Sequence, residues 1–239
     1  MLKLPEINCD LGEGIPNEEL IYPLIDTASI ACGGHFGNKN TISQSIGLAR
    51  AYQKKVGAHP SYPDQKNFGR KTMEISREDL QKSILNQIQT FELQAEKAKL
   101  PMDHIKFHGA LYNDAASNSE FADHLTDFIA SNFWQTALFI PPHSQLAYFA
   151  EQKGLILRNE VFGDRCYQDN YQLMPRSESG ALMVSVSEIS AQLETLLHYG
   201  YVSSASGEKL QMKADTICFH GDNPEIATIL SSIRKRFWT

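Results

Sequence analysis

Short apolar runs alternate with longer amphipathic segments along nearly the whole chain. This alternation is typical of parallel β/α units, in which a buried strand is followed by a covering helix. Strands are predicted at residues 6–10, 27–32, 55–59, 104–108, 137–141, 157–162 and 216–220.

The clearest helical pattern covers residues 76–99. Its apolar residues recur at three- and four-residue steps and form one stripe, made of Leu80, Ile84, Ile88, Phe91, Ala95 and Ala98. Ser76 with Asp79 resembles a capping box at its start. Similar stripes predict helices at 119–130, after residue 187, and after 222. The last of these should begin with Asn223 as N-cap and Pro224 at the first helical position.

Reactive or ionisable residues follow nearly every predicted strand. Five of the eight histidines lie at carboxyl ends of strands: His35, His59, His108, His143 and His220. An open doubly wound sheet gathers its ligand groups at one switch point, whereas a barrel brings every strand end to a common cup. We therefore predict a single α/β domain over residues 1–239, folded as a distorted (β/α)7-type TIM-like barrel with the active site in that cup.

Composition and charge narrow the function classes. The chain has 239 residues and a formal net charge of −6, and its one basic cluster is Arg234-Lys235-Arg236 in the last turn of a predicted helix. Nucleic-acid binding is therefore disfavoured. We find neither a signal-peptide pattern nor an apolar stretch of membrane-spanning length. The four cysteines lie far apart, mostly in apolar runs, so a reduced, cytoplasmic protein is expected.

Seven short motifs, in order, resemble the LamB/YcsF family over almost the entire chain, residues 8–234. They read NCDLGE at 8–13, ACGGH at 31–35, GAHPSYPD at 57–64, FGR at 68–70, HGALYN at 108–113, EVFGDR at 160–165 and HGDNP at 220–224. Three positions depart from the family pattern. Asn38 stands where an aspartate is usual, Phe107 where a proline is usual and Gly163 where an alanine is usual. Only Asn38 removes a candidate functional group.

The resemblance implies a barrel related to the glycoside hydrolase and deacetylase barrels. It also implies an ATP-dependent 5-oxoprolinase, which opens the lactam ring of 5-oxoproline to give glutamate. The active enzyme would then contain two further subunits that look like the two parts of an allophanate hydrolase.

Such a reaction needs a base for water, cations for anionic groups and an acid for the leaving nitrogen. The catalytic candidates are Asp10, Glu13, His35, His59, His108, Asp164 and His220. Among them Asp10, Glu13 or Asp164 is expected to act as base, alone or by orienting a histidine, and His59, His108 and His220 are expected to exchange protons near neutral pH. The substrate-binding candidates are Lys106, Arg165 and Asp222, with Arg70 and Arg176 as weaker candidates on loops.

Two questions stay open at the sequence level. Asp10, His35 and His59 offer the ligand types of a catalytic metal, but no compact metal-binding spacing is present. ATP with Mg²⁺ is the expected cofactor, yet the chain has no P-loop motif, so the nucleotide must bind at another kind of site or in a partner.

Two other functions compete with the oxoprolinase interpretation. A stand-alone metal-dependent deacetylase or amidohydrolase would share the barrel and the strand-end histidines, but it would need a metal and no ATP. A non-catalytic binding subunit of a carboxylase-like complex is less consistent with so many ionisable groups in one cup.

Overall fold

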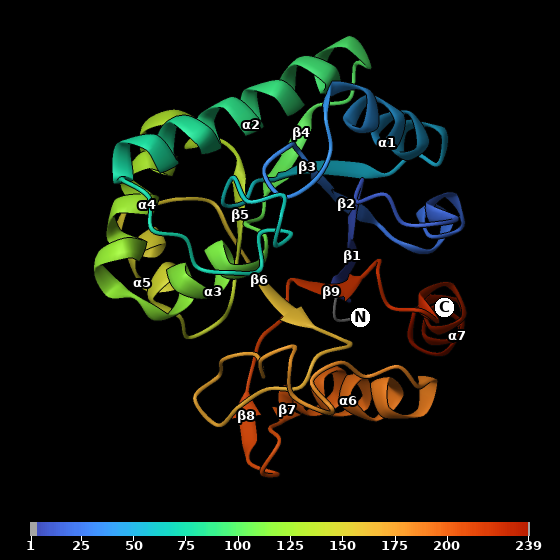
Figure 1. Cartoon of the computed structure of the whole chain (residues 1–239). Helices are drawn as coiled ribbons and strands as arrows, with labels where there is room; N and C mark the ends of the chain where they lie inside the picture. Colours follow the sequence, from blue (N-terminus) through green and yellow to red (C-terminus); the bar gives the residue numbers. More distant parts are fainter. Residues whose placement is uncertain (1–3, 239) are drawn as a thin grey trace.

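Seven parallel strands close into a barrel in the computed structural model, which describes residues 4–238 (Figure 1). Around the barrel the order is β1-β2-β3-β4-β5-β6-β9, so the first and last strands pair with each other. The strands are β1 (Glu6–Leu11), β2 (Thr27–Ala31), β3 (Lys55–His59), β4 (Met102–Ile105), β5 (Ala137–Ile140), β6 (Leu157–Phe162) and β9 (Thr216–His220). The predicted TIM-like barrel is confirmed.

Helices surround this barrel and cover the outer faces of its strands (Figure 1). They are α1 (Lys39–Ala51), α2 (Arg77–Lys97), α3 (Gly109–Ser117), α4 (Ser119–Phe133), α5 (Gln145–Gln152), α6 (Val186–Tyr199) and α7 (Ile226–Phe237). Two short 3₁₀ helices, η1 (Glu18–Leu20) and η2 (Tyr22–Leu24), lie between β1 and β2. An antiparallel hairpin of β7 (Tyr201–Ser203) and β8 (Lys209–Gln211) follows α6.

The buried face of α2 matches the predicted stripe and includes Leu80, Ile84, Ile88, Phe91 and Ala95. Ser76 caps this helix by accepting a hydrogen bond from the Asp79 backbone N–H at 3.1 Å. In a full capping box the Asp79 side chain would also accept from the Ser76 backbone N–H. Here the Asp79 carboxylate accepts from the Ser76 hydroxyl at 2.8 Å instead.

Among the predicted boundaries, the end of the fourth strand and the start of the last helix are wrong by two residues or more. The fourth strand ends at Ile105, so Lys106 and His108 follow it, although their backbone N–H groups still donate to Ala58 and Pro60. The last helix begins at Ile226 and not at Pro224. The Asn223 side-chain oxygen accepts from the backbone N–H of Glu225, the residue before the helix, at 3.4 Å, and its amide donates to the Met183 carbonyl at 2.9 Å, so it caps none of the helical N–H groups.

One histidine belongs to the barrel core and not to its open end. His104 stacks on Phe139 at 3.9 Å between ring centroids, and its Nε2 lies 3.0 Å from the Ser29 hydroxyl. Gly57 makes room for this ring, because a Cβ there would lie 2.4 Å from the imidazole. The ring therefore fills the space between β2, β3 and β4.

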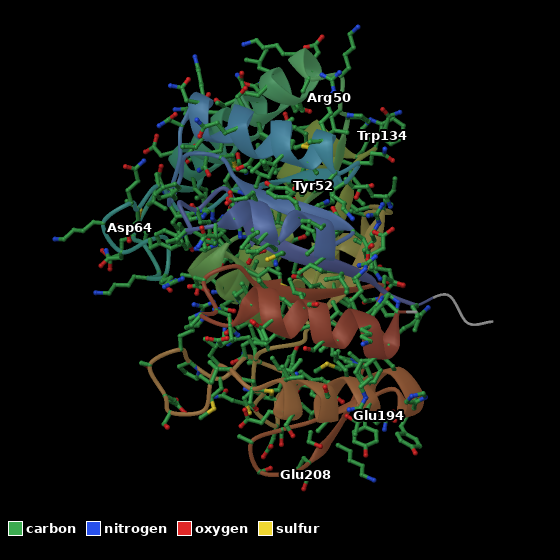
Figure 2. All side chains as sticks on the ribbon, turned by 90° about the vertical axis from the view of Figure 1, so that its right-hand side faces the viewer. Arg50, Tyr52, Asp64, Trp134, Glu194 and Glu208 are labelled. Atoms are coloured by element: carbon green, nitrogen blue, oxygen red, sulfur yellow. The ribbon has the colours of Figure 1, made fainter. Side chains whose placement is uncertain are left out.

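Figure 2 shows Arg50 and Glu208 at opposite ends of the molecule, on the α1 side and on the hairpin loop. Within residues 4–238, none of the helices has the length and hydropathy needed to cross a membrane.

Candidate active site

A cavity of about 860 Å³ opens at the carboxyl ends of the barrel strands. Parallel pairing places the strand ends at one level: Asp10 pairs with His220 on β9, and Ala31 pairs with His59 on β3. Loops after the strands, mainly residues 67–71 and 165–177, form the upper walls. The lining includes Asp10, His59, Lys106, His108, Arg165 and His220.

His220 and Asp164 form a hydrogen-bonded pair on one side of the cavity. The Nδ1–H of His220 donates to Asp164 Oδ1 at 2.9 Å, and the His220 backbone N–H donates to Asp164 Oδ2 at 3.0 Å. Asp164 is fully buried, whereas His220 is 9% exposed and stacks on Phe162. The carboxylate therefore fixes the imidazole tautomer and leaves Nε2 as a hydrogen-bond acceptor, the state required of a general base.

The floor of the cavity is a buried ion-pair cluster around Lys106. Its ammonium lies 2.6 Å from Asp10 Oδ1, 3.0 Å from Glu160 Oε1 and 3.0 Å from Cys218 Sγ. Burial alone would lower the pKa of Lys106, but the Asp10, Cys218 and Glu160 groups outweigh it and hold that pKa above its usual value. Burial opposes ionisation of Asp10 too, yet the Lys106 ammonium holds the pKa of Asp10 well below its usual range.

A wall of three histidines and one carboxylate stands beside Asp10. His59 Nε2 lies 3.5 Å from Asp10 Oδ2 and 3.0 Å from His108 Nδ1. His35 Nε2 lies 2.9 Å from Glu13 Oε1, and the His35 ring stacks in parallel on His108 at 3.6 Å. All four side chains are buried. Burial lowers the pKa of His108 well below its usual value, and the neighbouring His35 and His59 lower it further.

The loop after β3 packs directly on this wall. Gly69 has φ of +61°, and a Cβ there would lie 2.9 Å from the His35 Cβ and 3.1 Å from the His108 ring. Only glycine combines that backbone conformation with that close approach. Phe68 contacts the edges of the His35 and His108 rings, so an aromatic side chain closes the wall from outside.

Three arginines gather at the mouth of the cavity. Asp222 bridges two of them: it accepts from Arg70 at 2.6 Å and from Arg176 at 2.8 Å. Arg165 is buried and donates to the carbonyl oxygens of Met174 and Ala181, which holds the loop after β6 over the cavity. Burial, reinforced by Arg176, lowers the pKa of Arg165 to about 10, so it stays cationic at neutral pH.

The sequence profile of the LamB/YcsF family matches residues 5–238. The chain belongs to the LamB/YcsF family. The A subunit of the 5-oxoprolinase of Staphylococcus aureus strain JH9 is 34% identical to this LamB/YcsF chain over 235 residues, covering 96% of this chain and 94% of the relative. The protein of the same name from the bovine RF122 / ET3-1 strain has the same identity and coverage.

Solved structures agree with this membership. The crystal structure of a lactam utilization protein from Thermus thermophilus superposes with a TM-score of 0.88 at 30% identity, covering 98% of this chain and 97% of that one. A putative cellobiose-phosphate cleavage protein from Enterococcus faecalis V583 superposes with a TM-score of 0.59 at 12% identity, covering 97% of this chain and 92% of that one. The second likeness shows the shared fold alone.

The candidate residues of this LamB/YcsF chain divide between three positions. Asp10, His59, Lys106, His108, Arg165 and His220 line the cavity. Asp164, Glu13 and His35 lie behind that lining and orient it. Asp222 is occupied by the two arginines at the mouth. His143, the remaining strand-end histidine, lies exposed on the rim and its Nε2–H donates to the Gln211 carbonyl at 2.9 Å.

Two residues of the site were not among the predicted functional residues. Glu160 is a fully buried partner of Lys106, and it precedes the strand end instead of following it. Gln192 projects from α6 and its amide donates to the Phe162, Gly163 and Arg165 carbonyls. A glutamine beside the apolar stripe of Ile189, Leu193 and Leu196 is the signal that could have pointed to such an anchor.

Proposed function

We propose that this chain is the lactam-opening subunit of an ATP-dependent 5-oxoprolinase, which converts 5-oxoproline, ATP and two waters into glutamate, ADP and phosphate. The observation that carries the proposal is one cavity combining the Asp164–His220 pair with arginines at its mouth. The names of the relatives, which refer to 5-oxoprolinase and to lactam utilization, favour the same substrate class.

A lactam is resonance-stabilised and resists neutral water, so activation must precede hydrolysis. Transfer of the ATP γ-phosphoryl group to the lactam carbonyl oxygen makes the ring carbon electrophilic. Water that has lost a proton to His220 Nε2 then attacks that carbon. The carbon–nitrogen bond breaks as the nitrogen takes up a proton, and the resulting acyl phosphate is hydrolysed by a second water.

The charges of the cavity suit the anionic groups of this reaction. Arg70 and Arg176 share Asp222, so an incoming carboxylate or phosphate can replace the Asp222 carboxylate as the partner of either guanidinium. Guanidinium groups bind both kinds of anion in a bidentate manner. Lys106 already contacts two carboxylates, so we assign it first to holding Asp10 in its ionised form.

We further propose that the active enzyme is a cytoplasmic assembly with two other subunits resembling the parts of an allophanate hydrolase. The relatives are named as one subunit of an enzyme, which supports an assembly. ATP enters with Mg²⁺, and the nucleotide site lies either above this cavity or in a partner.

The test is to measure glutamate and ADP released from 5-oxoproline with MgATP, using the chain alone and the chain co-purified with both partners. The expected result is equimolar release by the assembled complex. Absence of glutamate from the intact complex, with hydrolysis of acetylated sugars or simple amides instead, would replace this function by a stand-alone amidohydrolase activity.

A further inference from the structure

Two buried histidines in the wall of the cavity have their tautomers fixed by backbone carbonyl groups. His59 Nδ1 lies 2.8 Å from the Lys106 carbonyl oxygen, and His108 Nε2 lies 3.0 Å from the Phe68 carbonyl oxygen. A carbonyl oxygen only accepts hydrogen bonds, so each of these nitrogens carries the N–H. In a neutral imidazole the other ring nitrogen is then a bare lone pair.

These two bare nitrogens face each other. His59 Nε2 and His108 Nδ1 are 3.0 Å apart, with the rings perpendicular at 88°. Two lone pairs at this distance repel, and both side chains are largely buried in the wall of the cavity. Either a proton shared by the two nitrogens or a metal ion bound by both would remove this repulsion.

Carboxylates stand on both sides of the pair. Asp10 Oδ2 lies 3.5 Å from His59 Nε2, and Glu13 Oε1 lies 3.4 Å from His108 Nδ1. Ligand atoms bound at about 2.0–2.2 Å to one ion are separated by about 3.0–3.5 Å in tetrahedral or cis-octahedral geometry. The three contacts fall within that range, and two histidines with a carboxylate form a common site for divalent transition metals.

We propose that His59 Nε2 and His108 Nδ1 bind one divalent transition-metal ion, with Asp10 and Glu13 as the flanking carboxylate ligands. The inference is independent of the proposed lactam chemistry, because it concerns what the chain binds. His59, His108 and Asp10 line the cavity, so an ion there has an open side toward the substrate. A water bound on that side would be acidified into a nucleophile.

The surroundings of this proposed metal site resemble an outer ligand sphere. The Lys106 and Phe68 carbonyl groups orient the two imidazoles, and the Lys106 ammonium orients Asp10 at 2.6 Å. Such outer hydrogen bonds commonly hold metal ligands in place.

His35 orients a ligand and is not itself one. Its ring is parallel to that of His108, 3.6 Å away and 5° from coplanar orientation, so the in-plane lone pairs of both rings cannot point at one ion. Its Nε2 instead lies 2.9 Å from Glu13 Oε1. This replaces the sequence-based set of Asp10, His35 and His59.

A second group of possible ligands, Asp10, Cys218 and His220, is a poorer site. The Lys106 ammonium already contacts Asp10 at 2.6 Å and Cys218 at 3.0 Å, so a cation occupies that position.

The test is metal binding by the full chain, independent of turnover. Chelator-treated protein is titrated with Co²⁺ and Zn²⁺ by calorimetry, and Co²⁺ is followed by its d–d absorption. One ion per chain is expected, with affinity reduced about 100-fold in His59→Gln and His108→Gln and about 10-fold or more in His35→Gln. His143→Gln, which removes an exposed strand-end histidine, should bind like the wild type.

Electron paramagnetic resonance of Cu²⁺ bound to the wild-type chain tests the same site without a variant. Two imidazole nitrogens in the coordination sphere would support the proposal even if the glutamine variants fail to fold. Binding of less than about one ion in ten chains at millimolar metal, or unchanged affinity in both folded glutamine variants, would overturn it. A strongly downfield imidazole N–H resonance in the proton NMR spectrum that persists in excess Zn²⁺ would also overturn it. Such a resonance would show that a proton shared by His59 Nε2 and His108 Nδ1 occupies the proposed metal position.

Discussion

Asn38 stands where the family pattern leads one to expect an aspartate, and its side chain caps α1. Its Oδ1 accepts from the backbone N–H groups of Asn40 at 2.8 Å and Thr41 at 3.4 Å, while the Thr41 hydroxyl accepts from the Asn38 N–H. Asn38 is exposed and does not line the cavity. The departure from the family pattern therefore takes no group from the candidate active site, since both residue types cap helices well.

This cap gives a prediction for a single side chain. Asn38→Ala should lower the free energy of unfolding by about 1 kcal/mol, because it leaves two backbone N–H groups without an acceptor. Asn38→Asp should stay within about 0.5 kcal/mol of the wild type, since a carboxylate at a helix start accepts the same bonds. Urea denaturation measures the free energy of unfolding of both variants. An alanine variant as stable as the wild type would show that solvent replaces the cap.

At the scale of elements, the strands and the histidines at their ends were the most predictable features. Strands β3, β6 and β9 have their predicted limits. The short apolar run of β9 marks a strand that is buried along its whole length. The helices α1, α3 and α5 escaped prediction. Two of them, α3 and α5, have only 9 and 8 residues, which is too short for an apolar stripe to stand out in the sequence, and tertiary packing stabilises them.

The side-chain pairings within the site could not be predicted in the same way. Strand ends place His59, His108 and His220 in one cup, but the partner of each depends on loop conformation. The Phe68 carbonyl reaches His108 only because the chain turns sharply at Gly69. Contacts between residues far apart in the chain have no local signature in the sequence.

An ion pair fastens β4 to β6 across the intervening strand β5. Arg158 donates to both Asp103 oxygens, at 2.6 and 3.1 Å. Burial alone would raise the pKa of Asp103, but hydrogen bonds from His104 and Arg158 outweigh it and hold the pKa below its usual value. Because the folded-state pKa is depressed, the stabilisation is fully present above the unfolded-state pKa of about 3.9 and is lost as the pH falls further.

Asp103→Asn should therefore lower the free energy of unfolding by about 1–2 kcal/mol at pH 7, a range that allows for partial solvent screening of the pair. The difference from the wild type should shrink as the pH falls from about 4 toward 3. Urea denaturation of both proteins across this pH range measures the difference in their free energies of unfolding. The matched control is Asp127→Asn, which removes an exposed partner of Lys153 and should cost less than about 0.5 kcal/mol. An Asp103→Asn effect that does not vary with pH would contradict an electrostatic role.

For the whole molecule, barrel closure is what assembles the cavity. β1 and β9 lie at opposite ends of the chain and pair directly, which brings Asp10 level with His220. The loop after β6 then covers the opening, held by Arg165 and by Gln192 from α6. Long-range pairing of this kind places the groups for binding and proton transfer in one cup, as in other barrels.

The most direct test of the account is the turnover of Asp164→Asn in the assembled complex. Asparagine keeps the size of the side chain but no longer fixes His220 in the tautomer with a free Nε2, so glutamate release should fall by about 10²–10⁴-fold. Co-purification with the partners and the thermal midpoint should stay close to those of the wild type. Glutamate release at the wild-type rate would contradict the assignment of His220 as the base that opens the lactam.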